Sequence, residues 1–136
     1  MSLRVEHIAL AVADLDAAIA HYGAVWGLEV AHRERVEDQG VEEAMLPIGD
    51  SYLQLLGTTD PETTVGKFLA KRGPGLHHIG YAVDDVAEEA ARLRSEGLTQ
   101  VDLGDHVGAA FFYQKDVQGV LTELVPYQTP GARLHS

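Results

Sequence analysis

The feature that most constrains this chain is an internal repeat that spans nearly all of it. Residues 6–14 read EHIALAVAD, and residues 77–85 read HHIGYAVDD. His7 in the first copy recurs as His78 in the second, and the aliphatic residues and the aspartate that follow recur at the same spacing. Such a repeat constrains the fold more than any single motif does, because the two copies are expected to fold into similar units.

Each copy predicts a strand, a helix and three further strands. The alternating residues of the two openings predict strands. Asp14 and Asp85 are typical N-cap residues for the helices that follow, which Gly27 and Gly97 would end. The remaining strands are expected at 28–36, 41–48 and 52–56 in the first copy, and at about 98–103, 108–115 and 119–126 in the second.

The predicted fold class is α+β, with two β-α-β-β-β modules whose four-stranded sheets form a concave, metal-holding cleft and whose helices lie outside. The length of 136 residues is that of a single domain. We expect module one at about 3–57, a linker helix within about 61–75, module two at about 76–127 and a C-terminal tail at 128–136.

Composition narrows the class of protein further. The chain has no cysteine, which excludes disulfides and thiolate chemistry. It shows no apolar run long enough to span a bilayer and no secretory leader, so a soluble, cytoplasmic protein without a membrane partner is expected. The net charge of −11 argues against a nucleic-acid partner. Cations gather locally, most clearly at Lys67, Lys71 and Arg72.

Four polar side chains are predicted to project from strands toward the concave interior. His7 and His78 come from the two openings, and Gln54 and Glu123 come from the equivalent closing strands YLQLL and LTELV. One histidine in a strand is usually an ordinary hydrogen-bonded residue, but two at equivalent positions favour a metal site, because each is followed on its own face by small residues that are expected to keep a cavity open. Two imidazoles, a carboxylate and an amide oxygen suit Co²⁺, Mn²⁺, Fe²⁺, Ni²⁺ or Zn²⁺. Four protein ligands on an octahedral ion leave two positions for a substrate.

Other polar residues are less constrained. Strand alternation predicts that His77 points away from His78, to the outer face. Glu43 shares a strand face with Val41 and Met45, where a charge is unexpected, so it lies either at a solvated edge or toward the cavity. The remaining histidines are expected at the surface: His21, His32, His106 and His135.

The paired modules and their paired candidate ligands resemble the vicinal oxygen chelate superfamily. Within it, the chain is similar to the methylmalonyl-CoA epimerase family along nearly its whole length. The resemblance rests on HIALAV, QGVEEAMLPIGDSYLQLL (39–56), DPETTVGKFLAKRGPGLHHIGYAVDD (60–85) and GVLTEL (119–124). The central segment with its double histidine is the most specific part, whereas HIALAV and GVLTEL alone indicate only the superfamily.

The resemblance implies a homodimeric enzyme that interconverts the (R) and (S) forms of methylmalonyl-CoA. The reaction would proceed by proton abstraction at C2 through a metal-stabilised enolate. The implied metal ligands are His7, Gln54, His78 and Glu123, with Co²⁺ favoured and Mn²⁺, Zn²⁺ or Ni²⁺ as the other candidate ions. The implied acid/base pair is Glu43 and Glu123.

The chain departs from the family pattern near its end. The family usually shows a glycine-rich loop and then a His-Pro-Lys step, whereas this chain reads LGDHVGAA at 103–110 and then Tyr113-Gln114-Lys115. The departure bears on which acyl-CoA is accepted and leaves the predicted metal ligands untouched.

Three other functions remain open at this level. An extradiol iron dioxygenase would use two histidines and one carboxylate, for which Gln54 is an extra ligand. A glyoxalase I-type isomerase has a closer ligand set, but it does not explain the central segment. A non-catalytic, ligand-sequestering member of the superfamily would generally lack the metal ligands.

Overall fold

The computed structural model describes residues 3–37, 40–102 and 108–127. The predicted succession of strands and helices is present except for the strand expected at about 98–103, and the α+β fold class is confirmed. The elements in chain order are β1 (Arg4–Ala11), α1 (Leu15–Trp26), β2 (His32–Val36), β3 (Val41–Ile48), β4 (Ser51–Gly57), α2 (Thr64–Arg72), β5 (Gly75–Val83), α3 (Val86–Ser95), β6 (Ala110–Phe112), a short 3-10 helix η2 (Gln114–Asp116) and β7 (Thr122–Pro126).

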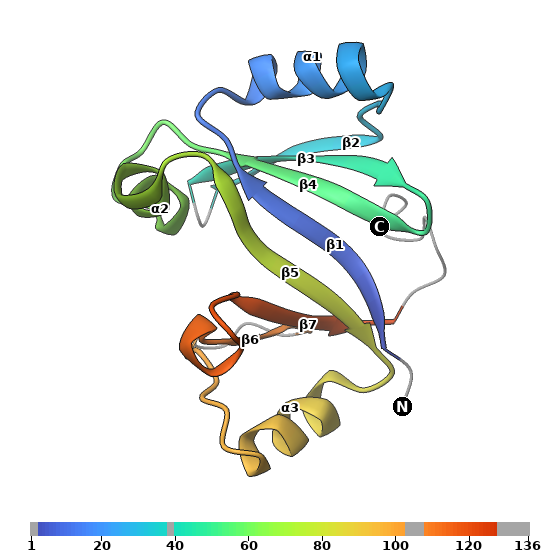
Figure 1. The fold of residues 1–136 in the computed structure, drawn as a ribbon, viewed down its shortest axis with the longest axis vertical. Helices are drawn as coiled ribbons and strands as arrows, with labels where there is room; N and C mark the ends of the chain where they lie inside the picture. The colour runs from blue at the N-terminus through green and yellow to red at the C-terminus, as the bar shows by residue number, and fades with distance from the viewer. Residues whose placement is uncertain (1–2, 38–39, 103–107, 128–136) are drawn as a thin grey trace.

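The strands form one mixed sheet of seven strands in the order β2-β3-β4-β1-β5-β7-β6. Antiparallel pairing of β1 with β5 joins the two modules, and these two strands cross the middle of the molecule in Figure 1. Within each module the opening strand pairs in parallel with the closing strand, β1 with β4 and β5 with β7. The strand expected at 98–103 differs from the prediction, since its described residues contribute only a single bridge between Gln100 and Phe112.

The helix boundaries follow the predicted caps. Asp14 and Asp85 each accept a hydrogen bond at 3.0 Å from a backbone N–H of the first turn, of Ala17 and Glu88 respectively. Gly27 ends α1 in the left-handed conformation, with φ at 70°, which a glycine adopts without strain. No helix within the described ranges is long and apolar enough to cross a membrane.

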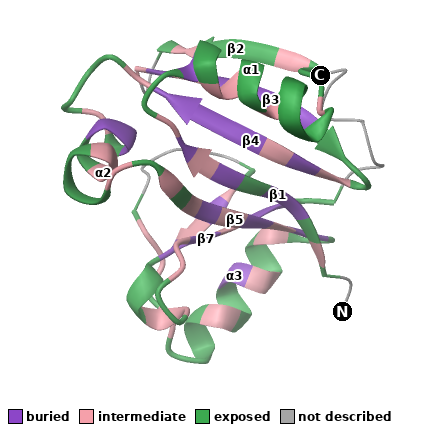
Figure 2. Cartoon of the chain, turned by 45° about the horizontal axis from the view of Figure 1, so that its top comes forward, coloured by how far each residue is buried: buried purple, intermediate pink, exposed green. Residues whose placement is uncertain are grey.

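The helices α1, α2 and α3 are divided between the two faces of the sheet. Helices α1 and α3 pack against the same face, which we call the outer face, through two apolar clusters; Figure 1 shows these helices at opposite ends of the molecule. One cluster contains Leu15, Ala44, Leu46 and Leu55, and the other contains Val83, Ala90, Ala110, Phe112 and Leu124. Most purple, buried segments in Figure 2 lie in the central strands.

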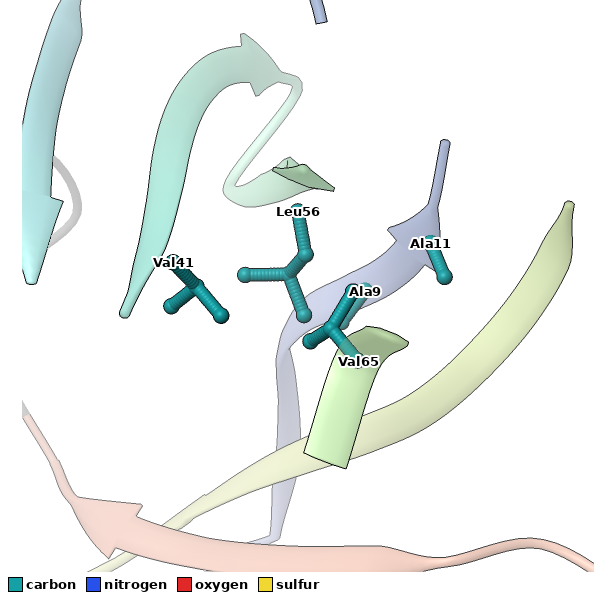
Figure 3. Packing of buried hydrophobic residues seen from close by; sticks show 5 residues of the cluster. All are labelled: Ala9, Ala11, Val41, Leu56 and Val65. Atoms are coloured by element: carbon teal, nitrogen blue, oxygen red, sulfur yellow. The ribbon is translucent and has the colours of Figure 1, made fainter. Parts of the chain in front are cut away.

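Helix α2 instead packs against the opposite, inner face of the sheet, at one end. Its Val65 contacts a cluster that includes Ala9 and Ala11 of β1, shown in Figure 3. The small residues that follow His7 were interpreted as leaving open space. That interpretation is wrong for these two alanines, because α2 fills the space over them.

Candidate functional site

Strand register brings the four predicted ligands to the inner face. Ala9 of β1 pairs with Gln54 of β4 on one side and with His78 of β5 on the other. Gly80 of β5 pairs with His7 and with Glu123 of β7. Directly paired residues of neighbouring strands share a face. Four adjacent strands, β4, β1, β5 and β7, therefore supply one polar side chain each to the same face.

Three of these side chains meet directly. Nε2 of His7 lies 3.1 Å from Nε2 of His78 and 2.9 Å from Oε1 of Glu123. Nε2 of His78 lies 3.3 Å from the same carboxylate oxygen. The two imidazole rings meet edge to face, with their planes 89° apart. The ligand atoms of these three residues all lie within 4.8 Å of one another, close enough to hold one metal ion.

A glycine makes room for this arrangement. A Cβ at Gly80 would lie 2.1 Å from Cε1 of His7 and less than 3 Å from both of its ring nitrogens. The imidazole of His7 therefore occupies the space that any larger residue at position 80 would take. Gly80, the small residue that follows His78 on the same face, was predicted to keep a cavity open. The imidazole of His7 fills that space.

Gln54 and Glu43 form the adjoining part of the site. Nε2 of Gln54 donates a hydrogen bond of 2.5 Å to Oε2 of Glu43, and their side chains are buried, with residue exposures of 5% and 8%. Burial excludes the solvated-edge alternative for Glu43. The other amide atom, Oε1 of Gln54, is buried and has no hydrogen-bond partner among the described residues. An orphaned acceptor of this kind typically costs about 1–3 kcal/mol, so it marks a place for a ligand.

Interactions between Glu123 and the two histidines shift the pKa values at this site. Burial raises the pKa of Glu123, but its hydrogen bonds to His7 and His78, together with their charges, outweigh burial and lower the pKa to about 2. Burial lowers the pKa of His7, and its hydrogen bonds to Glu123 and Glu6 raise it by more, so the net shift is upward. In the metal-free site Glu123 is thus held as a carboxylate anion, which is the form in which a carboxyl group binds a cation.

Two residues at this site were not predicted from the sequence. Glu6 and His77 precede the two histidines, and each contacts the Nδ1 atom of the histidine that follows it. The prediction that His77 points to the outer face is wrong, because β5 changes register at His77 and the strict alternation fails there. The one available signal was the repeat itself, in which both ligand histidines follow a polar residue in an otherwise apolar strand.

The other described histidines, His21 and His32, do not join this cluster. His32 is half-buried, and its Nε2 lies 3.4 Å from Oε2 of Glu34. His32 and Glu34 bring ligand atoms within 4.8 Å of Glu43, at the edge of the inner face. His21 is exposed, as predicted. His106 and His135 lie outside the described residues.

The chain is similar in sequence to known proteins. A sequence profile of the Glyoxalase/Bleomycin resistance protein/Dioxygenase superfamily matches residues 6–113. The ethylmalonyl-CoA/methylmalonyl-CoA epimerase of Cereibacter sphaeroides is 33% identical over 128 residues, which cover 89% of this chain and 96% of that protein.

Solved structures show the same fold. A variant of the Streptomyces coelicolor methylmalonyl-CoA epimerase in complex with 2-nitronate-propionyl-CoA superposes with a TM-score of 0.87 at 44% identity, covering 94% of this chain and all of that one. A methylmalonyl-CoA epimerase in complex with methylmalonyl-CoA and NH4+ superposes with a TM-score of 0.86 at 42% identity, covering 96% and 98% of the two chains.

Proposed function

Because this chain belongs to the glyoxalase, bleomycin resistance protein and dioxygenase superfamily, and is similar to methylmalonyl-CoA epimerases over most of its length, we propose that it is a metal-dependent epimerase of methylmalonyl-CoA. The observation that carries the proposal is the inner-face site itself. On one face of the sheet, it combines a cluster of His7, His78 and Glu123 with a second buried carboxylate, Glu43, which accepts a hydrogen bond from Gln54.

The donors at the site fit a divalent cation. Two imidazoles, a carboxylate and the unpartnered Oε1 of Gln54 make up a mixed nitrogen and oxygen set. Such sets suit Co²⁺, which we favour, as well as Mn²⁺, Zn²⁺ and Ni²⁺. The residues assigned to hold the ion are His7, Gln54, His78 and Glu123. When bound, the ion supplies positive charge that stabilises the negative charge developing on the thioester oxygen of the substrate.

The two carboxylates are assigned to proton transfer. Epimerisation at C2 requires one group that removes the proton from one face of the substrate and another that returns a proton to the opposite face. Glu43 comes from β3 and Glu123 from β7, on either side of the three central strands β4, β1 and β5. A substrate over the central strands would therefore have one carboxylate on each side.

The two carboxylates differ in their hydrogen-bond partners. Glu123 contacts the imidazoles of His7 and His78, which lower its pKa to about 2, whereas Glu43 accepts a hydrogen bond from the amide of Gln54. Because the reaction runs in both directions, we assign each carboxylate as the base for one epimer and as the acid for the other.

The acyl-CoA substrate also needs a site for its phosphates. Arg33 is occupied by ion pairs with Asp16 and Glu42, both at 2.7 Å. The basic end of α2, at Lys71 and Arg72, is the better candidate for the nucleotide portion of CoA. The departure at Tyr113-Gln114-Lys115 falls at the 3-10 helix η2, after β6.

A homodimer and a cytoplasmic location complete the proposal. The central strands carry exposed apolar residues on the outer face, between α1 and α3, notably Ile8 at 39% and Leu76 at 44% exposure. A second copy packed against this surface would cover them. Light scattering after size-exclusion chromatography should give the mass of a dimer for the wild type and of a monomer for Ile8→Lys.

The test of the activity is isotope exchange. Purified protein with Co²⁺ and one epimer of methylmalonyl-CoA in D₂O should form the other epimer and acquire deuterium at C2. Loss of both signals in well-folded, metal-loaded protein would refute the proposal. Parallel assays with catechols under oxygen and with a glutathione hemithioacetal would then identify a dioxygenase or a glyoxalase-type isomerase. A folded protein without metal or turnover would indicate ligand sequestration.

A further inference from the structure

The pairing of β1 with β5 contains two register shifts, one on each strand. Glu6 is the extra residue of the first shift, on β1, and His77 is the extra residue of the second, on β5. An extra residue of this kind is a β-bulge, which redirects the side chains around it. Both bulged residues directly precede a histidine of the inner-face cluster, so a bulge occurs at the equivalent position in both modules.

Each bulged residue contacts the same atom of the histidine that follows it. Oε1 of Glu6 contacts Nδ1 of His7, and Nδ1 of His77 lies 2.8 Å from Nδ1 of His78. The other ring nitrogens, the two Nε2 atoms, face each other at 3.1 Å across the proposed metal site. Each imidazole is therefore held at Nδ1 from outside the cluster and presents Nε2 to its centre.

We propose that Glu6 and His77 are positioning residues that set the tautomer and the ring orientation of His7 and His78 for metal binding. The inference rests on the metal site proposed above. A histidine that binds a metal through Nε2 must keep its proton on Nδ1, and an acceptor at Nδ1 fixes that tautomer. Glu6 and His77 act through the histidines and touch neither the ion nor the substrate.

Of the two positioning residues, Glu6 is expected to have the larger effect on its histidine. Its side chain is buried and its carboxyl oxygen contacts Nδ1 of His7; as a carboxylate it would accept the Nδ1–H and make that imidazole a better electron donor. Removing the Glu6 side chain would leave the His7 ring free to rotate and would remove the carboxyl group at its Nδ1 atom.

His77 acts as a neutral acceptor. To accept the Nδ1–H of His78, its own proton must be on Nε2. Its ring is fixed edge-on against Phe68 of α2, with ring centroids 5.0 Å apart. The linker helix between the modules therefore fixes His77, and through it the second ligand histidine.

The test measures metal affinity, with no need for turnover. The variants Glu6→Gln, Glu6→Ala and His77→Phe would be compared with wild type by competition of Co²⁺ between protein and a chelator. The exposed Glu29→Gln is the matched control, because it removes the same charge away from the site. Side chains that hydrogen-bond to metal-binding histidines typically contribute about 10- to 100-fold in affinity, so that loss is expected for Glu6→Ala, with smaller losses for Glu6→Gln and His77→Phe.

A spectroscopic readout separates positioning from a merely structural role. In Zn²⁺-loaded protein with ¹⁵N-labelled histidine, His7 and His78 should both show a protonated Nδ1 and a metal-bound Nε2. Glu6→Ala should alter this signature at His7 and leave His78 unchanged, and His77→Phe should do the reverse. If Glu6→Ala does not fold, Glu6→Gln, which preserves shape, decides the question through the same two measurements.

The outcomes distinguish this inference from the proposed function. Wild-type metal affinity and an unchanged histidine signature in all three variants would overturn the positioning role and leave the epimerase proposal intact. A wild-type protein that binds no divalent cation would overturn the metal-dependent function, and the positioning role with it.

Discussion

Gln54 divides its amide between two tasks: Nε2 donates to Oε2 of Glu43 over 2.5 Å, while Oε1 stays buried without a hydrogen-bond partner among the described residues. The hydrogen bond fixes which end of the amide faces the carboxylate. The oxygen is thereby left for a cation. One side chain thus connects the proposed base to the proposed metal ligands, and the two roles can be separated by mutation.

Glu43→Gln should abolish most of the proton exchange and leave the metal bound. The substitution preserves the size of the side chain and removes the group that accepts the C2 proton. Because a positioned acid or base typically contributes 10²- to 10⁴-fold, we expect deuterium incorporation at C2 to fall at least about 100-fold. Metal content, measured by mass spectrometry of the purified protein, should match wild type.

The matched control for this variant is the neighbouring residue. Glu42 points to the other side of β3, where it pairs with Arg33 at 2.7 Å, and Glu42→Gln should therefore exchange deuterium like wild type. Equal rates in Glu43→Gln and Glu42→Gln would remove Glu43 from the mechanism.

Gln54→Leu should weaken metal binding. Leucine fills a similar volume but removes Oε1, the amide oxygen assigned to the ion, together with the Nε2–H that donates to Oε2 of Glu43. In the presence of a chelator, relief of the buried oxygen, whose desolvation typically costs about 1–3 kcal/mol, and loss of the hydrogen bond to Glu43 act in opposite directions, so the free energy of unfolding should change little. Competition for Co²⁺ should show lower affinity. A variant less stable without metal, with unchanged affinity, would show that Oε1 has only a structural role.

The repeat predicts the site because register follows from it. Residues at equivalent positions of two similar modules reach equivalent places in a joined sheet, so His7 and His78 could be paired from sequence, together with Gln54 and Glu123. Alternation along each strand is sufficient for this wherever the ladder is regular. The capping aspartates likewise determine where α1 and α3 begin, because their local hydrogen bonds do not depend on tertiary context.

Sequence reasoning fails where tertiary contacts interrupt the local pattern. A bulge depends on the partner strand, so the polar residue before each histidine marks Glu6 and His77 in the sequence but does not predict that they turn toward the histidines. Similarly, the alanines of β1 signalled that something must fit beside them, but not that α2 would do so. Small residues indicate that another part of the protein packs closely against them, but not which part.

Gly80→Ala should disturb the site from the neighbouring strand. The added Cβ would lie 2.1 Å from Cε1 of His7, so the imidazole must move. Overpacking of this kind typically costs about 1–3 kcal/mol, which thermal or denaturant unfolding would show, and Co²⁺ affinity should fall at the same time.

Gly23→Ala is the control for this substitution. The new Cβ would meet only ordinary contact, 3.6 Å from the backbone oxygen of Leu28, and alanine is the better helix former in α1. This variant should be as stable as wild type or more so, with full metal affinity. Unaltered Co²⁺ binding in Gly80→Ala would mean that His7 tolerates displacement and is not a tightly placed ligand.

Glu123 should make the metal-free protein sensitive to acid. Its pKa is lowered to about 2 in the folded protein by His7 and His78, against an ordinary value of 4.5, so the folded state holds fewer protons than the unfolded chain between these values. The stabilisation is therefore present above about pH 4.5 and is lost as the pH falls toward 2. In a chelator, the difference in free energy of unfolding between wild type and Glu123→Gln should shrink across this interval. Glu29→Gln, which removes an exposed carboxyl group away from the site, is the matched control. A pH-independent difference for Glu123→Gln would show that the carboxylate is not held ionised by the two histidines.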